Sequence, residues 1–162
     1  MEVYLLGHGI AEAGRPGHPD SERALTAEGK KKLREVLGVA RGARVEPTLV
    51  LTSPYCRAVQ TAELAAEVLE YRGDLLRTEA LVPDSRAAAV WEELRVHKDQ
   101  EQVLLAGLEP LFSMLTAFLL GCGNLQVDFK KGALVRIDVD RFGATPSGVL
   151  KWMLTPKVAG GG

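Results

Sequence analysis

The sequence has few cysteines and no excess of charge of either sign. Cys56 and Cys122 are the only two cysteines among 162 residues, too few for a disulfide framework and typical of unpaired thiols in a reducing compartment. The 20 basic and 21 acidic side chains leave a net charge of −1. This balance argues against nucleic acid or an anionic membrane as the main partner. We therefore expect a cytoplasmic protein that binds neither.

Long apolar runs and targeting signals are also lacking. The longest apolar stretch, residues 110–121, is too short to cross a bilayer. The N-terminus has no basic region followed by a secretory apolar segment. His18 and His97 have no partners at ligand spacing, so we expect no metal site and no cofactor. The length predicts a single domain over residues 1–157, followed by a flexible glycine-rich tail over residues 158–162.

The chain does contain a regular alternation of short apolar strands and amphipathic helices. This alternation predicts a three-layer α/β/α sandwich with a mostly parallel central sheet. The last two strands are expected to form an antiparallel, hairpin-like pair. The pattern predicts strands over residues 2–6, 48–52, 77–81, 102–106, 133–139 and 149–154, and helices over residues 26–41 (with Thr26 as N-cap), 57–71, 87–96 and 110–121.

Three short polar stretches follow the predicted parallel strands. They are residues 7–9 (GHG), 52–57 (TSPYCR) and 107–110 (GLEP). In open α/β sheets, ligands bind beyond the carboxyl ends of the strands. We therefore expect these stretches to converge in space on a binding site, although they lie far apart in the sequence.

His8 and Arg57 give this expected site its chemistry. An imidazole nitrogen can attack phosphorus and hold the phosphoryl group as a covalent intermediate. Arg57 stands near a helix N-terminus, and its fork of donors matches phosphate oxygens. Gly9 would let the backbone approach a ligand closely. Arg15 and Arg23, in or just beyond the loop after His8, are candidates for holding an anionic substrate.

Several of these stretches resemble the histidine phosphatase superfamily, which has the phosphoglycerate-mutase-like fold. The resemblance is carried by residues 3–12, by TSPYCRAVQTAE at residues 52–63, by residues 103–112, and by the ALT of residues 24–26 followed by Gly29. The short chain resembles the compact SixA-type protein phosphohistidine phosphatases. This implies a hydrolase of phosphohistidine in signalling proteins that works through a phospho-His8 intermediate. Glu79 and Asp84 lie where the superfamily often places its acid, while Glu109 is expected to favour the following helix N-terminus.

The chain departs from the family pattern at two pocket positions. Gly7 stands where the family has an arginine, and Leu108 stands where it has a second histidine. Removing one preorganised donor commonly costs about 100- to 1,000-fold in rate. The sequence therefore predicts impaired hydrolysis. One alternative is a catalytically dead module that binds phosphate or a phosphoprotein. A small-metabolite phosphatase ranks below both, because the chain has little room for insertions that cover small substrates.

Overall fold

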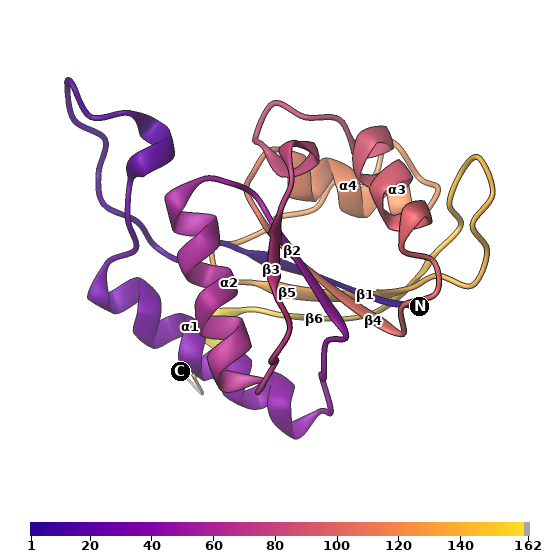
Figure 1. Ribbon diagram of the computed structural model, residues 1–162, viewed down its shortest axis with the longest axis horizontal. Helices are drawn as coiled ribbons and strands as arrows, with labels where there is room; N and C mark the ends of the chain where they lie inside the picture. The colour runs from indigo at the N-terminus through magenta and orange to yellow at the C-terminus, as the bar shows by residue number, and fades with distance from the viewer. Residues whose placement is uncertain (161–162) are drawn as a thin grey trace.

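Six strands form one mixed sheet in the computed structural model, which describes residues 1–160 (Figure 1). The strand order is β3-β2-β4-β1-β5-β6. The first four strands along the chain run parallel, β5 is antiparallel to β1, and β6 is antiparallel to β5. The bounds are β1 Glu2–Gly7, β2 Leu49–Thr52, β3 Leu75–Arg77, β4 Gln102–Gly107, β5 Leu134–Asp138 and β6 Val149–Leu154.

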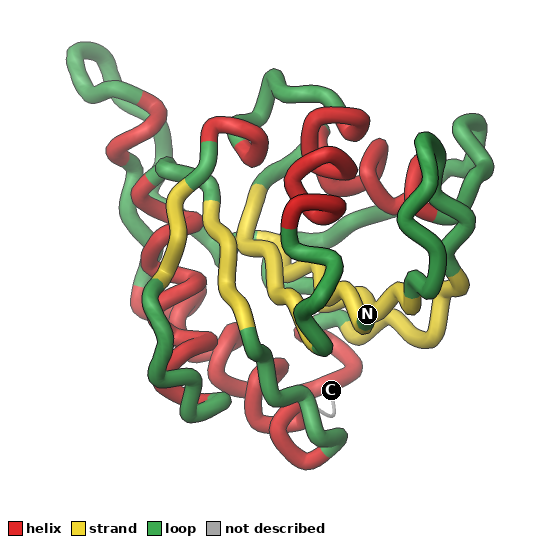
Figure 2. Tube along the Cα trace, turned by 45° about the vertical axis from the view of Figure 1, so that its right-hand side comes forward, coloured by secondary structure: helices red, strands yellow, loops and turns green. Residues whose placement is uncertain are grey.

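Helices cover both faces of this sheet (Figures 1 and 2). Helices α1 (Ala27–Gly42) and α2 (Cys56–Val68) pack on one face, and α3 (Ala87–Val96) and α4 (Leu111–Leu119) pack on the other. Side chains point alternately to the two faces along a strand. Tyr4 and Leu6 of β1 therefore pack in the core beneath α1 and α2, while Val3 and Leu5 pack in the core beneath α3 and α4. The three-layer α/β/α architecture predicted from the alternation is confirmed.

The central strands bring the three polar stretches to one edge of the sheet. In the parallel β1–β4 pair, Gly7 lies opposite Gly107. In the parallel β2–β4 pair, Thr52 lies opposite Ala106. The carboxyl ends of β1, β2 and β4 therefore meet, and the loops that follow them share one rim of the molecule.

The region after α2 differs from the prediction. The expected strand over residues 77–81 is wrong: β3 ends at Arg77, and Glu79–Leu81 is a 3₁₀ turn, η2. The Thr78 hydroxyl accepts from the backbone N–H of Ala80 and closes this turn. Leu81 lies in this turn and is buried in the core. An apolar residue at this position therefore indicated burial and not a strand. Helix α2 ends at Val68, three residues early, and Glu70 adopts a left-handed φ of 57° just beyond it.

The C-terminal segment forms a short helix, α5 (Pro156–Ala159), with Thr155 as its N-cap. Its last two residues fall within the segment expected to be a flexible tail, and residues 161–162 of that tail lie outside the described residues. Another short 3₁₀ turn, η1 (Asp20–Glu22), lies in the loop between β1 and α1 (Figure 1). Over residues 1–160, no helix combines the length and the apolar character needed to span a membrane.

Candidate active site

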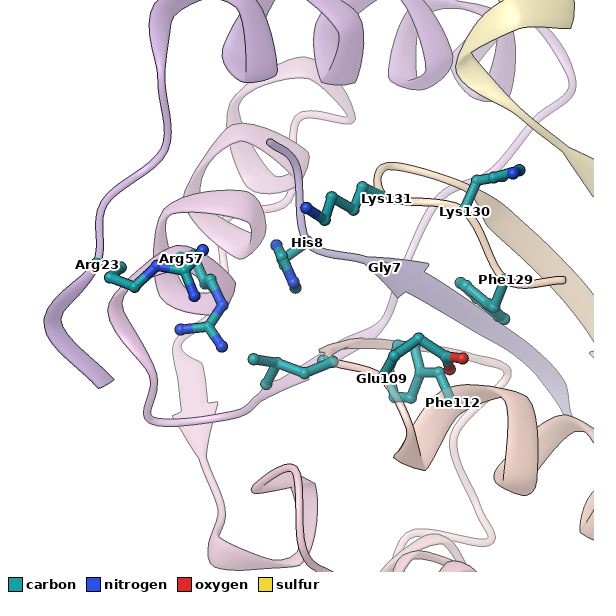
Figure 3. A pocket seen from close by; sticks show the side chains of 11 residues that line it. Gly7, His8, Arg23, Arg57, Glu109, Phe112, Phe129, Lys130 and Lys131 are labelled. Atoms are coloured by element: carbon teal, nitrogen blue, oxygen red, sulfur yellow. The ribbon is translucent and has the colours of Figure 1, made fainter. Parts of the chain in front are cut away.

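A cavity of about 270 Å³ opens at the shared rim of β1 and β4 (Figure 3). The residues that line it include five that were placed in the site from the sequence, namely Gly7, His8, Arg23, Arg57 and Leu108. The other lining residues are Gly107, Glu109, Phe112, Phe129, Lys130 and Lys131. The expected convergence of the strand-end loops therefore produces a real cavity with His8 in its wall.

His8 is held in one orientation by its neighbours. Its backbone N–H donates to the Gly107 carbonyl at 3.0 Å, which fixes the start of the loop. Its ring Nδ1 lies 2.6 Å from the Gly9 carbonyl oxygen. Because a carbonyl only accepts, Nδ1 carries the proton, and Nε2 of the neutral ring keeps its lone pair. The hydrogen bond therefore selects the tautomer that a nucleophilic Nε2 requires.

The surroundings of His8 favour its neutral form. The pKa of His8 is lowered to about 4, chiefly by burial and also by the positive charges of Arg57, Lys131 and Arg23, while the hydrogen bond to Gly9 opposes this shift. The ring is therefore uncharged near neutral pH. An uncharged imidazole is the form that attacks an electrophile.

Gly9, expected to let the backbone approach a ligand, is not among the residues that line the cavity. A Cβ at this position would lie 2.7 Å from Leu33 Cδ1 and 3.1 Å from the Gly29 carbonyl oxygen, so a side chain here would force these neighbours to shift. Gly9 therefore allows close packing on α1. Its backbone N–H donates to the Thr61 hydroxyl at 3.2 Å, and that hydroxyl donates to the Arg57 carbonyl at 2.7 Å. The glycine positions His8 and links it to the helix that carries Arg57.

Arg57 lies in the first turn of α2 with its side chain 8% exposed. Its Nη1 donates to the Asp20 carbonyl at 2.8 Å, and its Nη2 donates to Asp20 Oδ2 at 3.1 Å. The guanidinium also lies 5.2 Å from the centre of the Tyr55 ring. Its Nε is buried and finds no acceptor within residues 1–160. A buried donor without an acceptor costs free energy, so this guanidinium is not fully satisfied by its protein partners.

Asp20 joins the two cavity arginines, a contact that the sequence did not suggest. Its Oδ1 accepts from Arg23 Nη1 at 2.8 Å, while its Oδ2 accepts from Arg57. The hydrogen bond from Arg23, followed by that from Arg57, lowers the pKa of the Asp20 carboxyl. Arg23 is fixed further by donation from Nε to the Glu12 carbonyl at 2.7 Å. The arginines are thus held side by side around one carboxylate.

The loop before β5 supplies cavity residues that sequence reasoning missed. β5 pairs with β1, and the Gly132 N–H donates to the His8 carbonyl at 2.9 Å, so the loop lies against His8. Lys131 extends toward His8, whereas Lys130 points away from it (Figure 3) and pairs with Asp128 at 3.1 Å. The one signal in the sequence for these residues was a pair of adjacent lysines before a strand. Their position beside His8 depends on the pairing of β1 with β5, two strands more than 120 residues apart in the sequence.

Aromatic and aliphatic side chains occupy the side of the cavity that is formed by Gly7 and Leu108. A Cβ on Gly7 would lie 3.0 Å from Phe129 Cε1 and 3.3 Å from the Lys130 carbonyl oxygen. The Phe129 ring packs on that of Phe112, with centroids 5.5 Å apart. Leu108 is only 1% exposed. This wall offers an anion no side-chain donor, and Phe129 fills part of the space that an arginine at position 7 would need.

Besides Gly9, three residues singled out from the sequence are not among those that line the cavity. Arg15 is exposed in the loop after β1, and Glu79 and Asp84 are exposed in and after η2. The one carboxylate among the lining residues is that of Glu109, whose Oε1 accepts from the Ser113 N–H at 2.6 Å. Its expected role at the α4 N-terminus is thereby confirmed. Residues 1–160 contain no cluster of three or more His, Cys, Asp or Glu side chains able to hold a metal ion.

Comparisons with known proteins agree with this geometry. Residues 3–82 match the model of the histidine phosphatase superfamily (branch 1). The chain is 27% identical over 158 residues to phosphohistidine phosphatase SixA of Escherichia coli (strain K12), covering 96% of this chain and 94% of the relative.

Solved structures extend the likeness to the whole fold. The structure of the protein histidine phosphatase SixA complexed with tungstate superposes with a TM-score of 0.87 at 27% identity, covering 96% of this chain and 97% of that one. A putative phosphohistidine phosphatase SixA from Agrobacterium tumefaciens gives a TM-score of 0.82 at 22% identity, with 96% and 97% covered. The fold and the cavity define a phosphoglycerate-mutase-like domain with a histidine at its strand ends. The chain is similar over nearly its whole length to SixA proteins, and its residues 3–82 match the histidine phosphatase superfamily.

Proposed function

We propose that the cavity binds the phosphoryl group of a phosphohistidine side chain in a signalling protein and hydrolyses it slowly through a phospho-His8 intermediate. One observation carries the proposal. The neutral ring of His8 keeps Nε2 unprotonated in the wall of a cavity, and the same cavity is lined by Arg57, whose buried Nε has no acceptor among the described residues. The side chains of a nucleophile and of an arginine therefore line the same space.

The proposed reaction has two displacement steps. The Nε2 lone pair of His8 attacks phosphorus while the P–N bond to the substrate imidazole breaks, and the leaving imidazole takes a proton from water. Phospho-His8 is then a cation, stabilised by donation from Nδ1–H to the Gly9 carbonyl. Water next attacks phosphorus, the Nε2–P bond breaks, and inorganic phosphate leaves. A phosphohistidine leaving group needs little help from an acid, which suits a cavity whose single carboxylate is hydrogen-bonded at Ser113.

Reduced turnover follows from the donors that the cavity lacks. Charge on the three equatorial oxygens of the transferring phosphoryl group must be met by positioned donors. Arg57, Arg23 and Lys131 provide positive charge on one side, and Gly7 and Leu108 provide no side-chain donor on the other. Loss of two donors at about 100-fold or more each predicts a rate about 10⁴-fold below that of a complete site. The free thiols of Cys56 and Cys122 fit a cytoplasmic setting for this activity.

The test compares hydrolysis of a histidine-phosphorylated protein by this chain and by a repaired version. The repair is Gly7→Arg with Leu108→His, combined with Phe129→Ala because Phe129 occupies the space beside Gly7. His8→Ala in both backgrounds is the blank. Turnover that rises by orders of magnitude on repair and disappears without His8 supports the proposal. Turnover that is unchanged in the His8→Ala variants would overturn the proposal.

A second candidate is a module that binds a phosphoryl group or a phosphoprotein without hydrolysing it. The apolar wall of Leu108, Phe112 and Phe129 favours this alternative, because it stabilises no charge as the reaction proceeds. Phosphate binding is common to both functions, so turnover through His8 is the property that separates them. A small-metabolite phosphatase stays in third place, on the expectation that this chain lacks covering insertions.

A further inference from the structure

A second depression adjoins the His8 cavity and differs from it in character. It is a groove of about 550 Å³ with an apolar floor and a basic rim. Its lining residues, here called the lysine groove, are Ile10, Lys32, Phe129, Lys130, Lys131, Thr155, Pro156 and Lys157. Phe129, Lys130 and Lys131 line both depressions, so the groove begins where the cavity wall ends.

The lysines of this groove come from three separate parts of the fold. Lys32 belongs to α1, Lys130 and Lys131 to the loop before β5, and Lys157 to α5. Lys32 pairs with Glu28 at 3.2 Å and Lys130 with Asp128 at 3.1 Å. Within residues 1–160, neither Lys131 nor Lys157 has a carboxylate within 4.0 Å, and the groove lining itself contains no acidic residue. A chain with a net charge of −1 thus concentrates positive charge beside its candidate site.

The groove is held in shape by the same contacts that place the cavity. Gly132 has a φ of 77°, and a Cβ there would lie 3.2 Å from Pro156 Cγ, so α5 packs closely on the loop. The Gly132 N–H donates to the His8 carbonyl. Ile10 follows the His8 loop directly and forms part of the floor. The groove is therefore preformed, and its distance from His8 is fixed.

We infer that the lysine groove docks an acidic polypeptide segment carrying an apolar side chain, next to the phosphorylated residue that enters the His8 cavity. This inference rests on the proposed function. Carboxylates of the segment meet the four lysines, while an apolar side chain covers Ile10, Phe129 and Pro156. An extended chain advances about 3.3 Å per residue, so a few residues carry it from the cavity into the adjoining groove. The lysines then favour phosphoproteins that have acidic residues next to the phosphorylated residue.

Fluorescence anisotropy with short labelled peptides tests the inference. One peptide carries a stable phosphonate analogue of phosphohistidine flanked by Glu and Leu residues, and the other has each Glu replaced by Gln. The acidic peptide should bind about tenfold more tightly at low salt, since each rim charge contributes modestly and is screened. The Lys32→Gln/Lys157→Gln pair, which removes two of the four lysines, should reduce this difference to about threefold or less. The matched pair Lys31→Gln/Lys151→Gln, at exposed lysines outside the groove, should keep it.

Binding of inorganic phosphate separates failure of the groove from failure of the site. Both lysine pairs should bind phosphate as the unaltered chain does, which also shows that they fold. If phosphate binds and responds to Arg57→Ala, but the groove pair leaves the acidic preference intact, the groove inference falls alone. If phosphate does not bind at all, the proposed function falls. Two other outcomes overturn the acidic-segment assignment: stronger binding to phosphatidylglycerol vesicles than to the peptide, lost in the groove pair, or a dimer that the groove pair dissociates.

Discussion

The carboxylate of Asp20 lies 3.1 Å from Nη2 of Arg57 and 2.8 Å from Nη1 of Arg23, so one side chain of this protein occupies the two arginines that line the His8 cavity. A phosphoryl group entering the cavity would share these arginines with Asp20. Since the carboxylate is 57% exposed, its charge is partly screened by solvent, and its effect on a ligand should be moderate.

Replacing Asp20 by Asn should therefore tighten phosphate binding by about three- to tenfold, because a competing negative charge is removed while an acceptor for Arg57 is kept. Calorimetric titration with phosphate at constant ionic strength measures this change. A loss of affinity as large as that caused by Arg57→Ala would instead mean that the carboxylate is needed to position the arginines.

The pKa of His8 predicts a pH dependence of both chemistry and stability. Burial lowers this pKa from 6.5 to about 4, so Nε2 should stay reactive down to about pH 5 and become protonated near pH 4. At pH values between the unfolded pKa of 6.5 and the folded pKa of about 4, His8 binds a proton in the unfolded chain but not in the folded chain. The free energy of unfolding should therefore fall as pH drops from 6.5 to 4, by at most about 3 kcal/mol.

Denaturant unfolding measured across this pH range checks the His8 contribution. The His8→Gln variant should show a shallower decrease than the unaltered chain, because its side chain does not titrate. An identical slope in both proteins would show that His8 is not the group responsible.

Thr61 connects the His8 loop to α2 through its hydroxyl and is fully buried. Thr61→Val keeps the shape but leaves the buried Gly9 N–H without an acceptor. We expect a loss of about 1–3 kcal/mol in unfolding free energy and weaker phosphate binding. Thr61→Ser, which keeps the hydroxyl, is the control and should lose much less. Equal stability of the Val and Ser variants would contradict this role of the hydrogen bond.

Gly7 and Phe129 should be energetically coupled. An arginine at position 7 places its Cβ 3.0 Å from Phe129 Cε1, so Gly7→Arg alone should destabilise the fold by about 1–3 kcal/mol through overpacking. Phe129→Ala should relieve part of that cost, giving a favourable interaction term in a double-mutant cycle. Thermal unfolding of the four proteins measures it. Additive effects would show that the arginine side chain adopts a conformation that does not contact Phe129.

Local pattern predicted most of the fold because the central elements are strongly periodic or apolar. The predicted bounds of β1, β2, β4 and α1 each fall within one residue of those observed, and Thr26 is the N-cap of α1 as expected. The edge strand β3 was misplaced, because the burial of Leu81 in a turn looks the same in sequence as a strand position. The order of the elements and the ends of the central strands could therefore be predicted from the sequence, whereas the position of the short edge strand could not.

The candidate site was predicted where it depends on the parallel strands and missed where it depends on loops. His8, Arg57 and Leu108 follow strands whose carboxyl ends must meet. Asp20 reaches the two cavity arginines, and Lys131 reaches the cavity, from loops whose paths are set by tertiary contacts. Gly9 was predicted for its approach to a ligand, and its close packing against Leu33 was not foreseen.

The central claim is that His8 accepts a phosphoryl group in this protein as it stands. The most direct measurement is rapid-quench trapping with a ³²P-phosphohistidine protein, followed by mapping of the label. Acid-labile, alkali-stable label on the peptide that contains His8, formed and then slowly released, is the predicted result. Tight binding of the phosphoprotein with no label on His8 at any time would contradict the claim and leave a phosphoryl-binding module.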